Sequence, residues 1–277
     1  MYRRVIVGHD LREGGGDALA LGALIASSTG GELVVAGVFP IGTLPHGFEP
    51  QWREEEARIA SEIQAVADAA GARAEAFPSS SPARGLHDLA EEIEADLVVV
   101  GSSRHSKLGQ ILAGNVGLGL LHGSPCAVAV APRGYRDRAG DGLTAITVGF
   151  DGSEEARLTL GAALELAQAS RARLRLVAVV ERPAVAQGAE LKQEIAERTR
   201  AQLEEAAKSL PAELAAETTL LEGDPAEQLA GAADTPGGLL MLGSRAYGPV
   251  RRVLLGSVSG ALVRLAPSPL IVHPRGS

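Results

Sequence analysis

The stretch that decides the fold of this chain is residues 239–259, LLMLGSRAYGPVRRVLLGSVS. Its apolar start predicts a buried strand, its glycine- and arginine-bearing middle a loop, and Ser257 the start of a helix. Gly243 and Gly256 favour sharp turns and a close approach of the backbone to a ligand, and Ser257 is suited to capping the helix or binding an oxyanion. Converging backbone N–H groups attract phosphate. Taken alone, the stretch also fits an ordinary strand-to-helix connection.

An earlier copy of this pattern occupies residues 97–116, LVVVGSSRHSKLGQILAGNV. Gly243 follows Gly101 by 142 residues, and Gly256 follows Gly114 by the same interval. Near the start of each half, Asp151 follows Asp10 by 141 residues. A nearly constant offset across a whole domain indicates a tandem duplication. We therefore expect one domain at residues 1–134, a second at 143–277, and a polar, glycine-bearing linker at 135–142.

Strands and helices alternate in both halves. In the first half we expect strands at 4–9, 32–39, 72–77, 96–101 and 127–131, and helices at 17–28, 51–70, 83–94 and up to 123. In the second half we expect strands at 144–150, 173–180, 215–221, 239–243 and 269–273, and helices at 154–170, 188–209, 225–233 and 257–265. This order predicts an α/β fold of two tandem doubly wound, Rossmann-like domains, each a five-stranded parallel sheet with helices on both faces. Ligands then bind at the carboxyl ends of the strands, where Asp10 and Asp151 lie.

Composition excludes several classes of protein. A net charge of −8 and a pI near 5.4 argue against nucleic-acid binding. The single Cys126 excludes an internal disulfide and a cysteine metal cluster, and suits a reducing compartment. The apolar run after Arg4 is too short for a signal peptide, and no window reaches the length of a membrane span. We expect a soluble cytoplasmic protein with neither a membrane nor a nucleic-acid partner.

The sequence offers no evident catalytic or metal-binding constellation. The six histidines include no pair at the helical spacing of a zinc site. His9, next to Asp10, either faces the crevice or packs in the core. Serines lie outside any G-x-S-x-G elbow, and there is no Walker lysine. We therefore predict neither catalytic residues nor a metal site.

Three segments of the second half resemble the universal stress protein family: residues 146–154 (ITVGFDGSE), 223–226 (GDPA) and 265–272 (LAPSPLIV). The resemblance covers essentially the whole chain as a tandem pair of family domains. In the ATP-binding branch of that family the loop reads G-x2-G-x9-G-[ST]. Here Gly243 takes the first position, Ala246 the second, and Gly256 with Ser257 the last pair. In the first half Gly101 and Gly114 match, whereas Arg104 and Asn115 depart from the pattern.

The resemblance implies a nucleotide site in each half. The residues it assigns in the second half are Gly149, Asp151, Val179, Gly243, Ala246, Gly256, Ser257 and Val258. Those in the first half are Gly8, Asp10, Gly101, Arg104, Gly114, Asn115 and Val116. Because the second copy keeps Gly-Ser where the first has Gly-Asn, we expect tighter binding in the second half.

The expected function is that of a stress-response protein that binds ATP, or a related adenine nucleotide, and acts as a nucleotide-dependent regulator. A magnesium ion is expected with the phosphates. A very slow ATPase and a nucleotide-free structural module are the alternatives. The resemblance also implies that the last strands of the two halves, 127–131 and 270–273, pair within one chain. As a separate expectation, two such chains form a homodimer.

Overall fold

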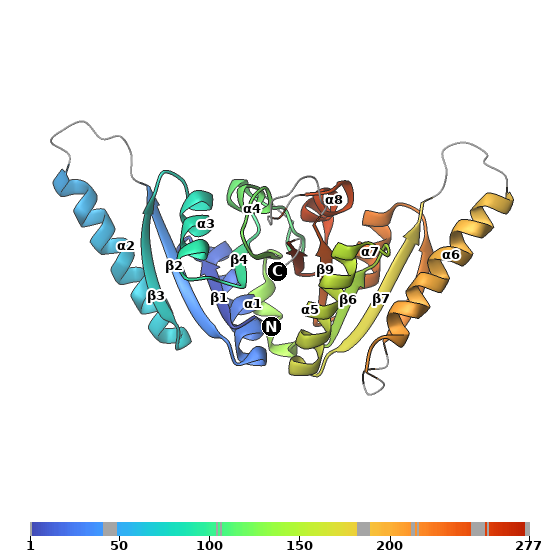
Figure 1. The fold of residues 1–277 in the computed structure, drawn as a ribbon. Coiled ribbons are helices and arrows are strands. Elements are labelled where there is room, and N and C mark those ends of the chain that lie inside the picture. The colour runs from blue at the N-terminus through green and yellow to red at the C-terminus, as the bar shows by residue number, and fades with distance from the viewer. Residues whose placement is uncertain are drawn as a thin grey trace.

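The two halves of the chain build one continuous ten-stranded sheet, in the order β3-β2-β1-β4-β5-β10-β9-β6-β7-β8 (Figure 1). The structure is a computed structural model that describes residues 2–40, 49–103, 105, 107–181, 189–211, 214, 216–244, 253 and 255–274. Within each half every strand pair is parallel, as the predicted doubly wound fold requires.

The elements follow the predicted order with small shifts at their ends. Those of the first half are β1 Arg4–Gly8, α1 Glu13–Thr29, β2 Glu32–Pro40, α2 Glu49–Ala70, β3 Arg73–Ser79, α3 Pro82–Glu92, β4 Leu97–Gly101, α4 Asn115–Leu121 and β5 Ala127–Ala131. Those of the second half are β6 Ala145–Gly149, α5 Glu154–Ser170, β7 Arg173–Val180, α6 Ala189–Lys208, β8 Glu217–Glu222, α7 Pro225–Ala233, β9 Gly238–Gly243, α8 Ser257–Leu265 and β10 Leu270–His273.

Helices cover both faces of the sheet. One apolar core packs α1 and α5 on one face, with Leu203 of α6, and a second packs α3, α4, α7 and α8 on the other. The run Leu97–Val100 is buried throughout, because side chains on both faces of β4 meet helices. Helices α2 and α6 lie at the two outer ends of the molecule (Figure 1).

Helix α1 begins four residues earlier than expected and includes three consecutive glycines, Gly14–Gly16. Glycine disfavours helix, so the sequence pattern indicated a loop there. Tertiary contacts reverse that preference. A β-carbon on Gly15 would lie 2.8 Å from the ring of His9, and the Asp10 carboxylate accepts the N–H groups of Arg12 and Gly15 at 3.0 and 2.9 Å. A side chain at Gly15 would therefore clash with the residues that follow β1.

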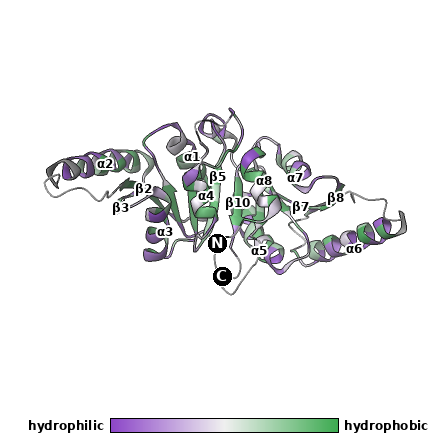
Figure 2. Cartoon of the chain, turned by 90° about the horizontal axis from the view of Figure 1, so that it is seen from above, coloured by the Kyte–Doolittle hydropathy of each residue, from purple (hydrophilic) through white to green (hydrophobic). Residues whose placement is uncertain are grey.

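The halves join through their last strands, and the predicted pairing within one chain is confirmed. Strand β10 runs antiparallel to β5, with Ile271 opposite Ala129. Both strands are hydrophobic and lie side by side at the centre of the molecule (Figure 2). Both apolar cores, one on each face of the sheet, therefore contain residues from the two halves.

A described residue from the glycine loop of each half also hydrogen-bonds to the other half. The N–H of Ile111 donates to the carbonyl of Ala266 beyond α8, and in return the N–H of Val253 donates to the carbonyl of Ser124, at 2.8 and 3.1 Å. Both Ile111 and Val253 are completely buried. Each loop is thus held by the end of the other half's last helix.

Residues 135–142, expected as a polar linker, are packed against the first half. They form two 3-10 turns, Tyr135–Asp137 and Ala139–Asp141, and the Tyr135 side chain is buried. The buried carboxylate of Asp17 in α1 accepts the N–H groups of Gly134 and Arg136, at 2.8 and 3.0 Å. This partner, more than a hundred residues away, explains why a polar stretch is ordered here.

Candidate functional site

A cavity of about 410 Å³ opens at the carboxyl ends of the second-half strands. It lies between β6, β7, β9 and the start of α8, at the position where doubly wound sheets bind ligands. Six of the predicted residues line it: Gly149, Asp151, Val179, Gly243, Gly256 and Val258. Its volume falls in the range of about 300–1,000 Å³ typical of small-molecule sites.

The other two residues predicted for the second-half site, Ser257 and Ala246, are not among the described residues that line the cavity. Ser257 is the first residue of α8 and exposed, and it does not line the cavity. The capping role expected of it belongs to Ser259, whose hydroxyl oxygen accepts the N–H of Gly256 at 2.9 Å. Ala246 lies outside the described residues, as do Arg245, Arg251 and Arg252. The positive end of the α8 dipole nevertheless meets the cavity through Gly256 and Val258.

The glycines have other roles than the expected sharp turns. Gly256 has φ −80° and ψ 178°, and Gly114 has φ −73° and ψ −178°, both extended conformations open to any residue. At Gly243 a β-carbon would lie 2.9 Å from the backbone of Glu155. At Gly101 it would lie 2.0 Å from the carbonyl oxygen of Gly14. The first glycine of each copy therefore permits close packing of the strand end against the first helix of its half.

Sequence reasoning missed Ser244, which follows the first glycine. Its side chain is 1% exposed and lines the cavity. Its N–H donates to the carbonyl of His273 at 2.8 Å, but its hydroxyl has no hydrogen-bond partner among the residues that the structure describes. In the first half the equivalent Ser102 hydroxyl donates to the carbonyl of Ala131 at 2.7 Å. A buried hydroxyl without a partner is costly, so Ser244 is suited to contact a polar ligand.

Other cavity residues were missed as well: Phe150, Ser153, Glu155, Glu181, Pro225 and Leu229 all line it. In the sequence, only their position next to predicted residues could have indicated them. Phe150 precedes Asp151, and Pro225 lies in segment 223–226, which resembles the universal stress protein family. The Asp151 carboxylate accepts the N–H of Ser153 at 3.0 Å through Oδ1. The cavity wall thus combines apolar side chains from β7 and α7 with carboxylates and serine hydroxyls.

The equivalent region of the first half holds two smaller cavities, of about 150 and 280 Å³. The smaller is lined by the predicted Gly8, Asp10, Gly101 and Val116. Gly114 and Asn115 line neither cavity. Arg104 lies outside the described residues. Asn115 is the first residue of α4, and Gly114 occupies the N-cap position without a side-chain hydrogen bond.

His9 lines both first-half cavities and packs over Gly15. Its Nδ1 accepts the N–H of Leu11 at 3.0 Å. Burial lowers the pKa of His9 and is opposed by the nearby Asp10 carboxylate, so the ring is neutral at neutral pH. Polar groups around the first-half cavities therefore bond to the protein itself.

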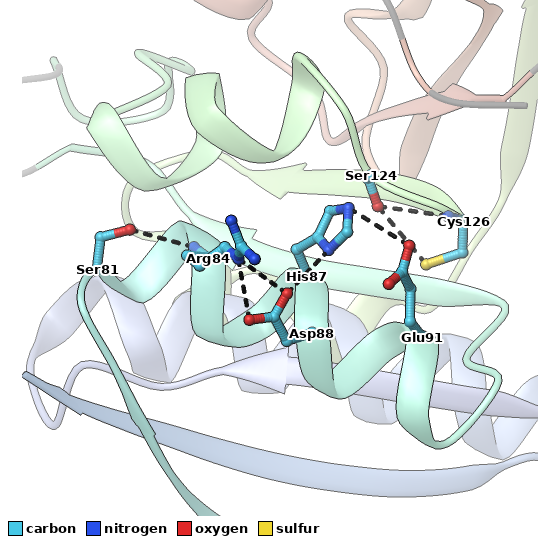
Figure 3. A network of polar contacts seen from close by, with 7 residues as sticks. All are labelled: Ser81, Arg84, His87, Asp88, Glu91, Ser124 and Cys126. Carbon is cyan, nitrogen blue, oxygen red and sulfur yellow. Dashed lines mark hydrogen bonds and ion pairs between the residues drawn. The ribbon is translucent and has the colours of Figure 1, made fainter. Parts of the chain in front are cut away.

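The remaining titratable groups do not form a metal centre in the parts of the chain that the structure describes. His87 on α3 contacts Asp88 and Glu91, with ring-nitrogen to carboxylate distances of 3.4 and 3.7 Å (Figure 3), and its side chain is only 18% exposed. Cys126 is buried beside Ser124, and burial raises the pKa of its thiol to about 12. None of the described helices combines the length and apolar character needed to span a bilayer.

Comparisons with known proteins agree with this geometry. A family model described as "Universal stress protein family" matches residues 1–132 and 143–274. A universal stress protein of Mycobacterium tuberculosis (strain H37Rv) is 32% identical over 205 residues, which cover 70% of this chain and 69% of that protein. A second from the same strain is 30% identical over 241 residues, covering 80% and 78%.

Among solved structures, a universal stress protein from Archaeoglobus fulgidus aligns over 100% of both chains, with a TM-score of 0.69 and 22% identity. At that identity the likeness concerns the fold, which is the same tandem α/β architecture.

Proposed function

This chain belongs to the universal stress protein family, and on that premise we propose that its second half binds ATP or a related adenine nucleotide as a regulatory ligand. The observation that carries the proposal is the cavity of about 410 Å³ that Ser244 and the start of α8 both line. Nucleotides need an apolar slot for the base and N–H or hydroxyl donors for the phosphates. Both kinds of surface are present here.

The cavity residues divide into two groups that fit the two ends of a nucleotide. Val177 and Val179 of β7 with Leu229 of α7 give the apolar side, next to Asp151. Gly256 and Ser244 lie on the donor side. Magnesium, if bound, takes its ligands largely from phosphate and water, as this ion commonly does, because the described residues form no cluster of three protein ligands.

We propose one nucleotide per chain, held by the second half. In the first half Asp10 Oδ1, Ser102 Oγ and His9 Nδ1 already have partners within the protein, and the nearest cavity is about 150 Å³. A ligand in the first half would have to replace the hydrogen bonds that Asp10, Ser102 and His9 make within the protein. A ligand in the second half would instead give Ser244 a hydrogen-bond partner.

The experiment is an equilibrium titration with a fluorescent ATP analogue on the whole chain. We expect saturable binding with a stoichiometry of one, competed by unlabelled ATP. Absence of saturation at millimolar ATP contradicts the proposal. Nucleotide retained on the purified protein, released by heating and identified by mass, distinguishes a binding protein from a nucleotide-free structural module.

The proposed role is regulatory rather than enzymatic, in a cytoplasmic stress response, with two chains forming a homodimer. A slow ATPase is the competing hypothesis. It predicts multiple turnovers that Asp151→Ala abolishes while ATP binding persists. Single-occupancy binding without turnover supports the regulatory role, and the mass of the protein in solution tests the dimer.

A further inference from the structure

A cavity of about 290 Å³, here called the linker cavity, lies between the segment that joins the two halves and the second half itself. Tyr135 and Arg138 of the joining segment line it. Its other lining residues belong to the turn between α7 and β9, residues 234–238, and to the turn between α8 and β10, residues 267–269. Both turns precede a strand, so the linker cavity lies at the opposite ends of the strands from the candidate nucleotide cavity. The two cavities have no described lining residue in common.

Backbone contacts hold the walls of the linker cavity in place. The N–H of Arg138 donates to the carbonyl of Tyr135 at 2.9 Å and closes the first 3-10 turn. The N–H of Thr144 donates to the carbonyl of Gly237 at 2.9 Å. A β-carbon on Gly237 would lie 2.6 Å from the carbonyl oxygen of Gly142, so the joining segment and the turn are in close contact. The cavity is therefore formed before any ligand binds, which removes an ordering cost from binding.

The linker cavity has a largely apolar wall. Three of its lining residues are prolines, which have no backbone N–H: Pro236, Pro267 and Pro269. The carbonyl of Pro236 accepts the Thr144 hydroxyl, and that of Pro269 accepts the N–H of Leu240 at 2.9 Å. The hydroxyl oxygens of Thr235 and Ser268 have almost no accessible surface, so a ligand does not reach them. Polar recognition in the cavity therefore depends on its charged side chains.

Two charged residues of opposite sign, Arg138 and Asp234, line the cavity, and both are exposed. Within the part of the chain that the structure describes, neither side chain forms an ion pair, with the other or with a third residue. Burial raises the pKa of Tyr135 to about 12, and the positive charge of Arg138 acts against that rise. The guanidinium therefore lies near the tyrosine wall, with its hydrogen-bond donors available to an anionic group.

Asp234 is placed where it attracts a cation. It is the C-cap residue of α7, and the last turn of that helix contains no basic residue. The carbonyl end of a helix carries a partial negative charge, to which the Asp234 carboxylate adds. One site for an anionic group, one for a cationic group and an apolar wall between them match a zwitterion. The volume lies just below the range of about 300–1,000 Å³ typical of drug-sized ligands, as expected for a ligand as small as an amino acid.

We propose that the linker cavity binds a free α-amino acid with an apolar side chain, whose carboxylate pairs with Arg138 and whose ammonium group pairs with Asp234. The side chain of the amino acid lies against the three prolines. The proposal stands independently of nucleotide binding, since none of the groups it uses lines the candidate nucleotide cavity.

The test is a titration of the full chain with L-leucine, followed by ligand-detected NMR and calorimetry. We expect saturable binding with a Kd of about 1 mM, as two charged contacts and one small apolar side chain allow. L-Leucinamide lacks the carboxylate and N-acetyl-L-leucine lacks the ammonium group, so each should bind about 5-fold more weakly. Equal affinity for the three compounds, or no saturation by L-leucine at tens of millimolar, overturns the proposal.

Two variants separate the contributions of the two charges. Arg138→Gln should weaken L-leucine binding about 5-fold and leave the binding of L-leucinamide, which has no carboxylate, unchanged. Asp234→Asn should likewise weaken L-leucine binding and leave the binding of N-acetyl-L-leucine unchanged. Because both residues are exposed, the Tm of the free protein should stay the same in both variants.

The matched controls are Arg136→Gln and Asp137→Asn, at exposed residues of the same joining segment that do not line the cavity. Both should bind L-leucine as the parent protein does. If Arg138→Gln or Asp234→Asn also binds L-leucine with the parent affinity, the assignment to the linker cavity is wrong. ATP titration of the four variants should show no change, so this result is separate from the outcome for the nucleotide site.

Discussion

The two halves of the chain have the same fold and nearly the same strand-end residues, yet their cavities differ. In the second half the cavity measures about 410 Å³ and contains an unpartnered serine hydroxyl, whereas the nearest first-half cavity measures about 150 Å³. The equivalent Ser102 bonds to Ala131, and His9 bonds to Leu11. Duplication thus kept the same scaffold in both halves, while small changes gave the two halves different cavities and different partners for the equivalent serines.

The largest expected effect on ATP binding comes from replacing Gly256, the N-cap residue of α8, with valine. Gly256→Val should abolish ATP binding, a loss of at least about 100-fold, because the side chain enters the proposed phosphate site at the start of α8. The backbone there is extended and accepts valine. The matched Gly114→Val should leave ATP affinity unchanged, since a β-carbon at 114 meets nothing closer than the Ser103 side chain at 3.6 Å. Fluorescent ATP titration of both variants measures the contrast, and equal losses would contradict the asymmetry.

A second comparison concerns the two loop anchors. Ile111→Ala should lower the free energy of unfolding by about 2–5 kcal/mol, because it empties a fully buried position against the other half. Val253→Ala, on the loop of the proposed nucleotide site, should cost less stability but also weaken ATP binding. Urea unfolding paired with ATP titration separates the two effects. An unchanged ATP affinity in Val253→Ala would show that this anchor does not position the site.

The serine pair allows a crossed test of smaller size. Ser244→Ala should weaken ATP binding about 10-fold, as loss of a hydrogen bond to a charged group does. It should not lower stability, because the hydroxyl has no partner among the described residues. Ser102→Ala should show the reverse, with stability lowered by about 1 kcal/mol through loss of the bond to Ala131 and ATP affinity retained. Thermal unfolding and ATP titration of both variants provide the measurement. Any result in which the two serines behave alike removes Ser244 from the proposed site.

The smallest expected effect concerns the pH dependence of stability. It is tested at His9, which corresponds to Phe150 in the second half. The pKa of His9 is lowered in the folded protein, so the unfolded chain binds the proton more readily. Stability is then complete above pH about 6.5, the ordinary histidine pKa, and is lost as the pH falls through the lower folded value. His9→Phe should reduce the drop in Tm between pH 7.5 and 5. Because His273 is shifted in the same direction, part of the drop should remain.

Much of the fold followed from the sequence. The alternation of apolar runs with helix-forming stretches predicted the strands and most of the helices, because burial on both faces leaves a pattern in the residues themselves. The duplication placed the two halves in correspondence, and the family resemblance predicted the pairing of β5 with β10. The start of α1 at Glu13 was missed, since three glycines disfavour helix until contacts with His9 and Gly101 are known.

For the candidate site, the sequence predicted which strand ends and which helix start line the cavity. Gly149, Asp151, Val179, Gly243, Gly256 and Val258 were named from sequence and line one cavity. The reason given for the glycines was wrong, because their φ and ψ angles are ordinary at Gly256 and the space at Gly243 is taken by α5. Backbone packing between elements that are distant in sequence leaves no local signal.

The sequence by itself determined the duplicated α/β scaffold and the order of its elements, since both depend on local periodicity and on turn residues, and with the family resemblance it named residues that line one cavity. Only the tertiary structure decided that Ser102 is satisfied and Ser244 is not, although both follow a strand-ending glycine. Their side-chain environments are set by Ala131 in one half and by the cavity in the other. Hydrogen-bond partners of buried groups come from distant parts of the chain, so the difference between the two halves exists only once the chain is folded.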